Sequence, residues 1–127
     1  DKLCECGWDH RKPSLMLFEG ISYYLTTEAI KSLVDVISPD RVIFEYLKAD
    51  DDVQADRVFI PNSIFGLIAT LCELPRIGKF NDALLRDLFN DQPIRKKLSM
   101  QQLEEMRTGA NRYFPTVDSG WINVCLV

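Results

Sequence analysis

Two cysteines and a histidine near the start of the sequence, Cys4, Cys6 and His10, have the types and spacing that could bind a metal. Zinc accepts thiolate and imidazole ligands, and Gly7 allows a tight backbone turn between them. A structural zinc ion takes four ligands, so a fourth would come from Asp9, another cysteine, a partner chain or water. The Cys-x-Cys spacing differs from the usual Cys-x-x-Cys pairs, and no second pair follows. The sequence therefore favours a tail with exposed thiols over the alternative, a zinc-ordered N-terminus.

The same residues could form a thiolate–imidazole pair for nucleophilic catalysis. A catalytic cysteine needs a shaped, partly buried pocket, which an irregular terminus does not provide. His10 is the only histidine in the chain, so mechanisms that need two histidines are excluded. The sequence also has no glycine-rich phosphate-binding loop and no nucleophile elbow. We therefore expect a non-catalytic protein with no cofactor, apart from the zinc that residues 4–10 could hold.

The charged residues are unevenly distributed along the chain. Residues 76–112 hold eight bases and five acids, a net charge of +3, whereas the whole chain has a net charge of −4. An acidic chain with one mildly basic segment is not the usual footprint of a dedicated nucleic-acid binder. Phosphate contacts from such bases would position a nucleic acid without reading its sequence. The candidate residues for a nucleic acid or an acidic partner are Arg86, Arg95, Lys96, Lys97, Arg107 and Arg112.

Four acids, Asp50, Asp51, Asp52 and Asp56, follow the strand that we predict over residues 41–47. A calcium-binding loop needs alternating acids, a glycine at its sharp turn and a late glutamate, and this segment has none of these. We interpret the segment as a solvated hairpin connection. If the segment has a function, we expect it to form a negatively charged patch that attracts a basic partner.

The most hydrophobic segment of the chain spans residues 57–74. It predicts a short strand over 57–60, a turn at Pro61 and Asn62, and a helix that is apolar on almost every side. Such a helix is usually buried on most of its sides. We therefore predict that it is the central helix of the core, that Cys72 is buried within it, and that Pro75 ends it.

The remaining elements follow from periodicity, caps and proline breaks. Thr26, Asn81 and Ser99 are predicted helix caps, and Ser99 with Gln102 forms a capping box. The last segment is apolar on both faces, which predicts a strand inside the sheet with Cys125 in the core. The predicted strands span residues 14–19, 41–47 and 121–127, with a further strand over 21–25 or a continuation toward the next helix. The predicted helices span residues 26–38, 81–89 and 99–114.

These elements predict an α+β fold: a small mixed or antiparallel sheet of about four to five strands with three to four helices packed against it. The length fits a single globular domain over residues 14–127, preceded by a tail or irregular loop over 1–13. Four cysteines without a disulfide pattern favour a reducing compartment, the cytoplasm or the nucleus. No apolar run approaches the length of a membrane-spanning helix, so no membrane is expected as a partner.

Two functional hypotheses from different classes follow. The first is a non-catalytic interaction or assembly domain, a module of a larger protein that binds another chain or a second copy of itself. Its basis is the full apolar core, the separation of acidic and basic segments and the lack of a convergent catalytic set. The alternative is a small nucleic-acid-binding domain, for RNA rather than DNA, with a zinc-ordered N-terminus. That alternative requires the bases of residues 86–112 to converge on one face.

Overall fold

The fold is described from a computed structural model, over residues 2–74 and 77–127. Its centre is a sheet of four strands in the order β1-β2-β4-β3. β1 runs parallel to β2, whereas β4 is antiparallel to both β2 and β3. The predicted α+β class with a mixed sheet is therefore confirmed. The strands are β1 (Leu15–Phe18), β2 (Arg41–Leu47), β3 (Lys96–Ser99) and β4 (Ile122–Leu126).

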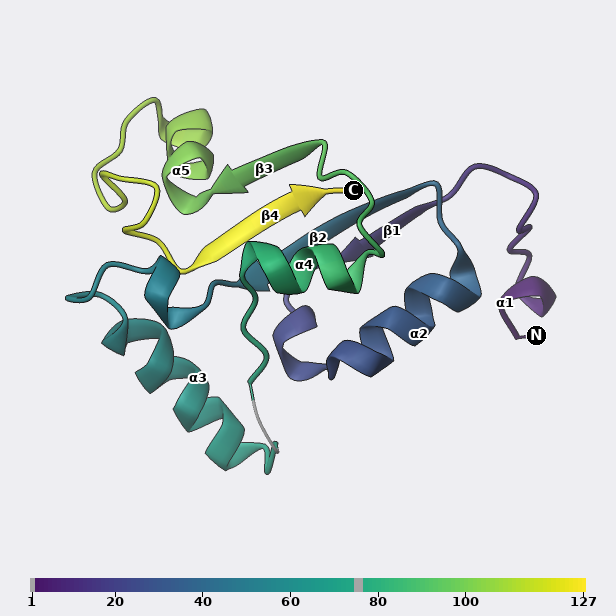
Figure 1. Cartoon of the computed structure of the whole chain (residues 1–127), viewed down its shortest axis with the longest axis horizontal. Helices are drawn as coiled ribbons and strands as arrows, with labels where there is room; N and C mark the ends of the chain where they lie inside the picture. The colour runs from purple at the N-terminus through teal and green to yellow at the C-terminus, as the bar shows by residue number, and fades with distance from the viewer. Residues whose placement is uncertain (1, 75–76) are drawn as a thin grey trace.

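Five α-helices accompany the sheet in the described part of the chain (Figure 1). They are α1 (Lys2–Glu5), α2 (Thr27–Ile37), α3 (Phe59–Leu71), α4 (Asp82–Leu88) and α5 (Met100–Thr108). Two short 3₁₀ turns, η1 (Ser22–Tyr24) and η2 (Asp50–Asp52), lie in the connections. None of the helices in residues 2–74 and 77–127 is long and apolar enough to span a bilayer.

The three predicted helix caps are confirmed. The Thr26 hydroxyl accepts a hydrogen bond from the Ala29 N–H at 3.1 Å. The Asn81 side chain accepts one from the Leu84 N–H at 2.9 Å. At α5, Ser99 and Gln102 form the complete capping box, with the glutamine carbonyl 2.9 Å from the Ser99 N–H. These contacts are local in sequence, which is why residue types alone predicted them.

One face of the sheet forms the main core. The inward residues of β1, β2 and β4 pack against α2 and α4, and Figure 1 shows α4 lying across the strands on this side. Ile30 of α2 and Leu85 of α4 are fully buried here, and the Phe44 ring at the centre contacts three other phenylalanines edge-on. The buried residues of this face are Phe18, Val42, Phe44, Tyr46, Cys125 and Val127.

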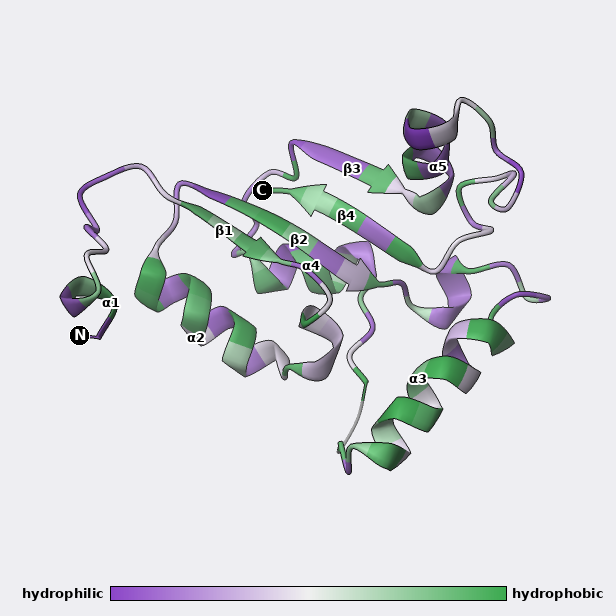
Figure 2. Ribbon diagram, turned by 180° about the vertical axis from the view of Figure 1, so that it is seen from behind, coloured by the Kyte–Doolittle hydropathy of each residue, from purple (hydrophilic) through white to green (hydrophobic). Residues whose placement is uncertain are grey.

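The opposite face of the sheet is open along β1 and most of β2, β4 and β3. Figure 2 shows the strands from this side with α4 behind them. Strand alternation places Leu17, Ile43, Val124 and Leu126 on this face. Leu15 and Leu17 are 59% and 56% exposed, and β1 has no partner strand on its outer edge among the described residues. We call this surface, with the outer edge of β1, the open sheet face.

The predicted central role of residues 57–74 is wrong. α3 extends away from the sheet (Figures 1 and 2), and only Pro61 and Phe65 in it are buried. Leu67 and Leu71 are 60% and 73% exposed. Phe65 nevertheless anchors the helix, because it packs with Tyr23 and Leu47 in a second, smaller core at the end of β2.

Other differences concern element boundaries. No strand forms over residues 57–60, because 57 and 58 lie in a turn and 59 and 60 begin α3. Residues 21–25 contain the 3₁₀ turn η1 instead of a strand. The helix predicted over 99–114 ends at Thr108, where Gly109 adopts a left-handed conformation with φ of 72°. β3 was not predicted. The strand predicted over 121–127 is confirmed inside the sheet, between β2 and β3.

The N-terminal segment 1–13, predicted as a tail or irregular loop, contains the short helix α1. The cysteine predictions split: Cys125 is buried as expected, whereas Cys72 is exposed because α3 is not part of the main core. Asp1, Pro75 and Arg76 lie outside the described residues, so the predicted helix stop at Pro75 does too.

Candidate functional site

A polar cluster lies at the carboxyl end of β1. Gly20 follows β1 with a positive φ of 65°, a conformation that glycine adopts without strain. Its N–H donates to the Glu45 carboxylate at 3.1 Å, and the Tyr23 hydroxyl donates to the same oxygen at 3.4 Å. The Ser22 hydroxyl donates to the Glu45 backbone carbonyl. One carboxylate on the open sheet face thus fixes the loop in which β1 ends.

The surroundings of Tyr23 change its acidity. Burial, and then the negative charge of Glu45, raise the pKa of the Tyr23 hydroxyl from 10.0 to about 12. Tyr23 therefore remains a neutral hydrogen-bond donor throughout the physiological range. The exposed Glu19 lies directly before Gly20, at the same end of β1.

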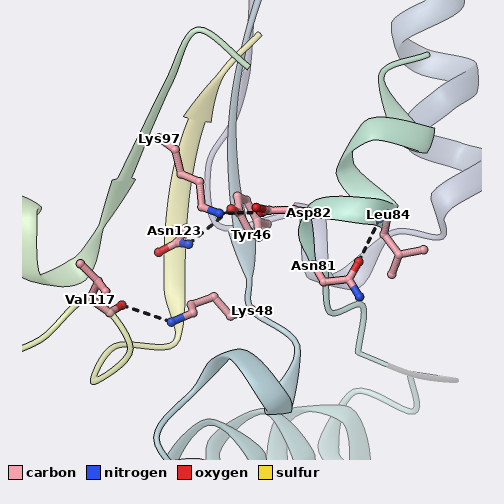
Figure 3. A network of polar contacts seen from close by, with 8 residues as sticks. All are labelled: Tyr46, Lys48, Asn81, Asp82, Leu84, Lys97, Val117 and Asn123. Atoms are coloured by element: carbon pink, nitrogen blue, oxygen red, sulfur yellow. Dashed lines mark hydrogen bonds and ion pairs between the residues drawn. The ribbon is translucent and has the colours of Figure 1, made fainter. Parts of the chain in front are cut away.

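A second polar region is a hollow of about 640 Å³ on the covered face, between the end of β2, the start of α4 and the loop before β4. Figure 3 shows its main contacts. Lys97 of β3 lies 2.6 Å from the Asp82 carboxylate. Lys48 donates hydrogen bonds to the carbonyls of Val117 and Gly120 at 3.2 and 3.1 Å. Burial lowers the pKa of the Lys48 amine, although nearby acids oppose that shift.

Asn123 of β4 lies in the wall of this hollow and is 5% exposed. Its amide nitrogen donates to the Tyr46 hydroxyl at 3.4 Å. Its side-chain oxygen Oδ1 is buried and finds no hydrogen-bond partner among the described residues. Buried polar atoms are rarely unpaired, because an unmade hydrogen bond is costly, so this atom is a notable feature of the hollow.

The structure does not gather Cys4, Cys6 and His10 into a metal site. Among residues 2–74 and 77–127, no group of three or more histidine, cysteine, aspartate or glutamate side chains is arranged to hold a metal ion. Cys4 and Cys6 are exposed, and the Asp9 carboxylate is engaged by Arg11 at 2.9 Å. Zinc binding at these residues stays a prediction, which native mass spectrometry of the wild type and Cys6→Ser would test.

The six candidate bases lie in different parts of the surface. Lys97 points toward α4 and pairs with Asp82, whereas Lys96 lines a groove on the open sheet face with Ile43 and Val124. Arg86 lies in the last turn of α4, Arg95 in the loop before β3, Arg107 in the last turn of α5 and Arg112 in the following loop. The structure therefore places neighbouring bases on opposite faces. Binding of a nucleic acid or an acidic partner stays a prediction.

The acidic residues lie around the connection after β2. Asp50, Asp51 and Asp52 form η2, and Asp50 pairs with Lys79 at 2.6 Å. Asp56 is exposed in the turn before α3. The connection leads into a helix, so the predicted hairpin is wrong. Binding of a basic partner by these four acids stays a prediction.

Sequence reasoning missed both polar regions. Glu45 and Gly20 are 25 positions apart, and Lys48 and Gly120 are 72 apart. The alternation of β2 correctly separates Glu45 from Tyr46, but no local pattern indicates which distant groups they meet.

Comparison with known protein families gives one partial match. The model of the leucine carboxyl methyltransferase family matches residues 1–38, which include α1, β1, η1 and α2. This is less than a third of the chain. A search of curated proteins found no match.

Proposed function

We propose that this chain is an assembly module of a larger methyltransferase, and that the carboxyl end of β1 borders the site of methyl transfer to a carboxylate. The observation that carries the proposal is the coincidence of the family match with the open edge. The matched residues 1–38 contain β1 and the connection to α2, and β1 is one of the two edge strands, with β3, whose outer edges are unpaired among the described residues. The activity in the family's name supplies the reaction class.

The topology supports an assembly role. β1 and β2 form a parallel pair connected through α2. All-parallel sheets are almost always covered on both faces, whereas this mixed sheet, which contains the parallel pair of β1 and β2, has one face covered. Exposed apolar side chains on the other face, such as Leu17, favour a second layer supplied by another part of the larger protein. The proposal thus keeps the interaction role predicted from the sequence, and the partner it assigns is another part of the same polypeptide.

The position of the polar loop supports the reaction class. In open α/β sheets, ligands bind outside the carboxyl ends of parallel strands, at the point where the strand order changes direction. A strand added at the outer edge of β1 would create such a point next to Glu19 and Gly20. The Glu45 network then holds this loop in one conformation.

Methyl transfer to a carboxylate requires little acid–base catalysis from the protein. The ionised carboxylate oxygen attacks the methyl carbon, a C–O bond forms, and the donor's bond to that carbon breaks with its electron pair. No proton has to be removed. Rate enhancement then depends on alignment of the two reactants and exclusion of water, which rigid loops at strand ends provide.

The test uses the natural polypeptide that contains residues 1–127. It is incubated with S-adenosylmethionine carrying a labelled methyl group and with a peptide ending in leucine. We expect base-labile label in the peptide with a free carboxylate and none in the amidated peptide. Glu19→Gln should reduce transfer, whereas Glu105→Gln, an exposed change on α5, should not. Equal label in both peptides, or no label in either, would contradict the proposed reaction.

A further inference from the structure

We infer that the outward side of α3 is a contact between two copies of this chain, in which the two α3 helices pack antiparallel. Four apolar side chains form this side, spaced four, three and four residues apart. They are Ile60, Ile64, Leu67 and Leu71, which we call the α3 seam. Apolar residues that alternate at three and four positions are the pattern by which two helices pack along their length. This inference does not rest on the proposed methyltransferase function.

The α3 seam is separate from the side of α3 that packs on its own domain. Pro61 and Phe65 are the buried residues of the helix, and Ile68 packs with Phe65 in the smaller core. Successive residues of an α-helix are rotated by about 100°, so the seam lies beside this buried side in a stripe about 60° wide. Three of the four seam residues are exposed. Figure 2 shows α3 standing apart from the sheet with hydrophobic residues along its length, so the described part of its own domain leaves the seam uncovered.

The spacing of the seam suits a second copy of α3. In an antiparallel pair, Ile60 lies opposite Leu71 of the other copy and Ile64 lies opposite its Leu67, and the two-fold axis repeats both pairs. Each layer of the contact is then filled by two aliphatic side chains. Because α3 extends away from the sheet (Figure 1), the antiparallel order also places the two sheets at opposite ends of the helix pair, where they do not collide.

The composition of α3 favours a protein partner over a lipid surface. The helix contains no charged residue, so packing two copies together desolvates no charge and brings no like charges together. Helices that lie on a membrane are usually rich in lysine or arginine on their polar side, and α3 has neither.

Small residues beside the seam allow close approach of a partner helix. They are Ser63, Gly66 and Thr70, and no other described element lies within 4 Å of the place that a Cβ on Gly66 would take. The Thr70 hydroxyl donates to the Gly66 carbonyl at 2.9 Å, so its burial in a contact would leave no unpaired donor.

The size of the contact predicts a weak, concentration-dependent dimer. α3 has 13 residues and is therefore about 20 Å long. At the area that a buried aliphatic side chain removes from water, the seam side chains of both copies bury about 500–1,000 Å² in total. Stable complexes bury about 1,200–2,000 Å², and weaker complexes bury less. We therefore expect a dimer that forms as the protein concentration rises and dissociates in dilute solution.

Sedimentation velocity of the 127-residue chain measures this association over concentrations up to about 1 mM, with a reducing agent to prevent cysteine cross-links. We expect the dimer fraction of the wild type to rise with concentration. Leu67→Glu places a carboxylate at the centre of the contact and should weaken association at least about tenfold. Leu17→Glu is the matched control, the same change at an exposed leucine of the open sheet face, and should associate as the wild type does. Melting curves confirm that each variant is folded.

A mixing experiment tests the antiparallel register. Ile64→Lys alone should also be monomeric, because each introduced lysine would face a leucine. Mixing Ile64→Lys with Leu67→Glu should restore a dimer of one copy of each, because the introduced lysine and glutamate lie opposite each other only in the antiparallel pair.

Several results would overturn the inference. They are a wild-type chain that stays monomeric, association that is lost in Leu17→Glu or kept in Leu67→Glu, and no mixed dimer of Ile64→Lys with Leu67→Glu. A monomeric chain that binds phosphatidylcholine vesicles would assign the α3 seam to a lipid surface instead. A natural polypeptide that protects the α3 amides from hydrogen exchange without dimerising would assign it to another segment of the same chain.

Discussion

The Lys48 side-chain nitrogen donates a hydrogen bond to the backbone carbonyl of Gly120 at 3.1 Å, which joins the end of β2 to the loop that precedes β4. The same amine also donates a hydrogen bond to the Val117 carbonyl.

In Lys48→Met these two loop carbonyls would lose their hydrogen-bond donor, although the methionine side chain would still fill the space. We expect a loss of about 1–3 kcal/mol in the free energy of unfolding, measured by urea denaturation. Lys96→Met, an exposed change on β3, should stay within about 0.5 kcal/mol of the wild type. If Lys48→Met lowered the free energy of unfolding by less than about 0.5 kcal/mol, the loop before β4 would not depend on this contact.

Phe65 is the buried aromatic residue through which α3 packs against the second, smaller core. Its ring packs edge-on against Tyr23, with centroids 4.9 Å apart, and it is 8% exposed. Phe65→Ala should lower the free energy of unfolding by about 3–5 kcal/mol, as truncation of a buried aromatic side chain does. Leu67→Ala, two residues further on the exposed side of α3, should cost less than about 1 kcal/mol. A similar cost for both substitutions would contradict the projecting position of the helix.

Ser99 begins α5 and belongs to the capping box with Gln102. Ser99→Ala removes the hydroxyl that accepts from the Gln102 N–H, so we expect a cost of about 1 kcal/mol and a lower melting temperature. Ser99→Asn, which preserves a capping acceptor, should recover most of that loss. An unchanged melting temperature in Ser99→Ala would mean that α5 does not depend on this cap.

Tyr23 should make stability sensitive to alkaline pH. Its pKa in the folded protein is raised from 10.0 to about 12 by burial and by Glu45, so the folded state holds this proton more tightly than the unfolded state. Its contribution is fully present below about pH 10 and is lost as the pH rises toward about 12. Urea denaturation across this range should show falling stability, with a smaller fall in Tyr23→Phe. The same pH dependence in both proteins would contradict the assignment to Tyr23.

The sequence predicted the features that depend on near neighbours. The caps at Thr26, Asn81 and Ser99 and the strand Arg41–Leu47 are confirmed because their signals lie within a few residues. β3 was missed because Leu98 is the only apolar residue among Lys96–Ser99, and backbone pairing with β4 forms the strand.

The misplacement of α3 has a different physical cause. Hydropathy indicates that an apolar helix will pack against other apolar surface. It does not indicate whether that surface belongs to the core of the same domain or to another part of the protein or a partner. The polar regions were missed because Glu45, Lys48 and Asn123 meet groups from distant elements. A binding role that depends on residues from distant elements can be inferred only after the fold is known.

The most direct test of the assembly proposal is hydrogen–deuterium exchange of the backbone amides in β1. The exchange rates of Leu15–Phe18 would be compared between the 127-residue chain and the natural polypeptide that contains it, with β4 as the internal reference. β4 lies between β2 and β3, so it should be protected in both. The proposal predicts that β1 gains protection only in the natural polypeptide, where another strand pairs with its outer edge. Equal exchange of β1 in both samples would contradict the claim that the open sheet face is a docking surface.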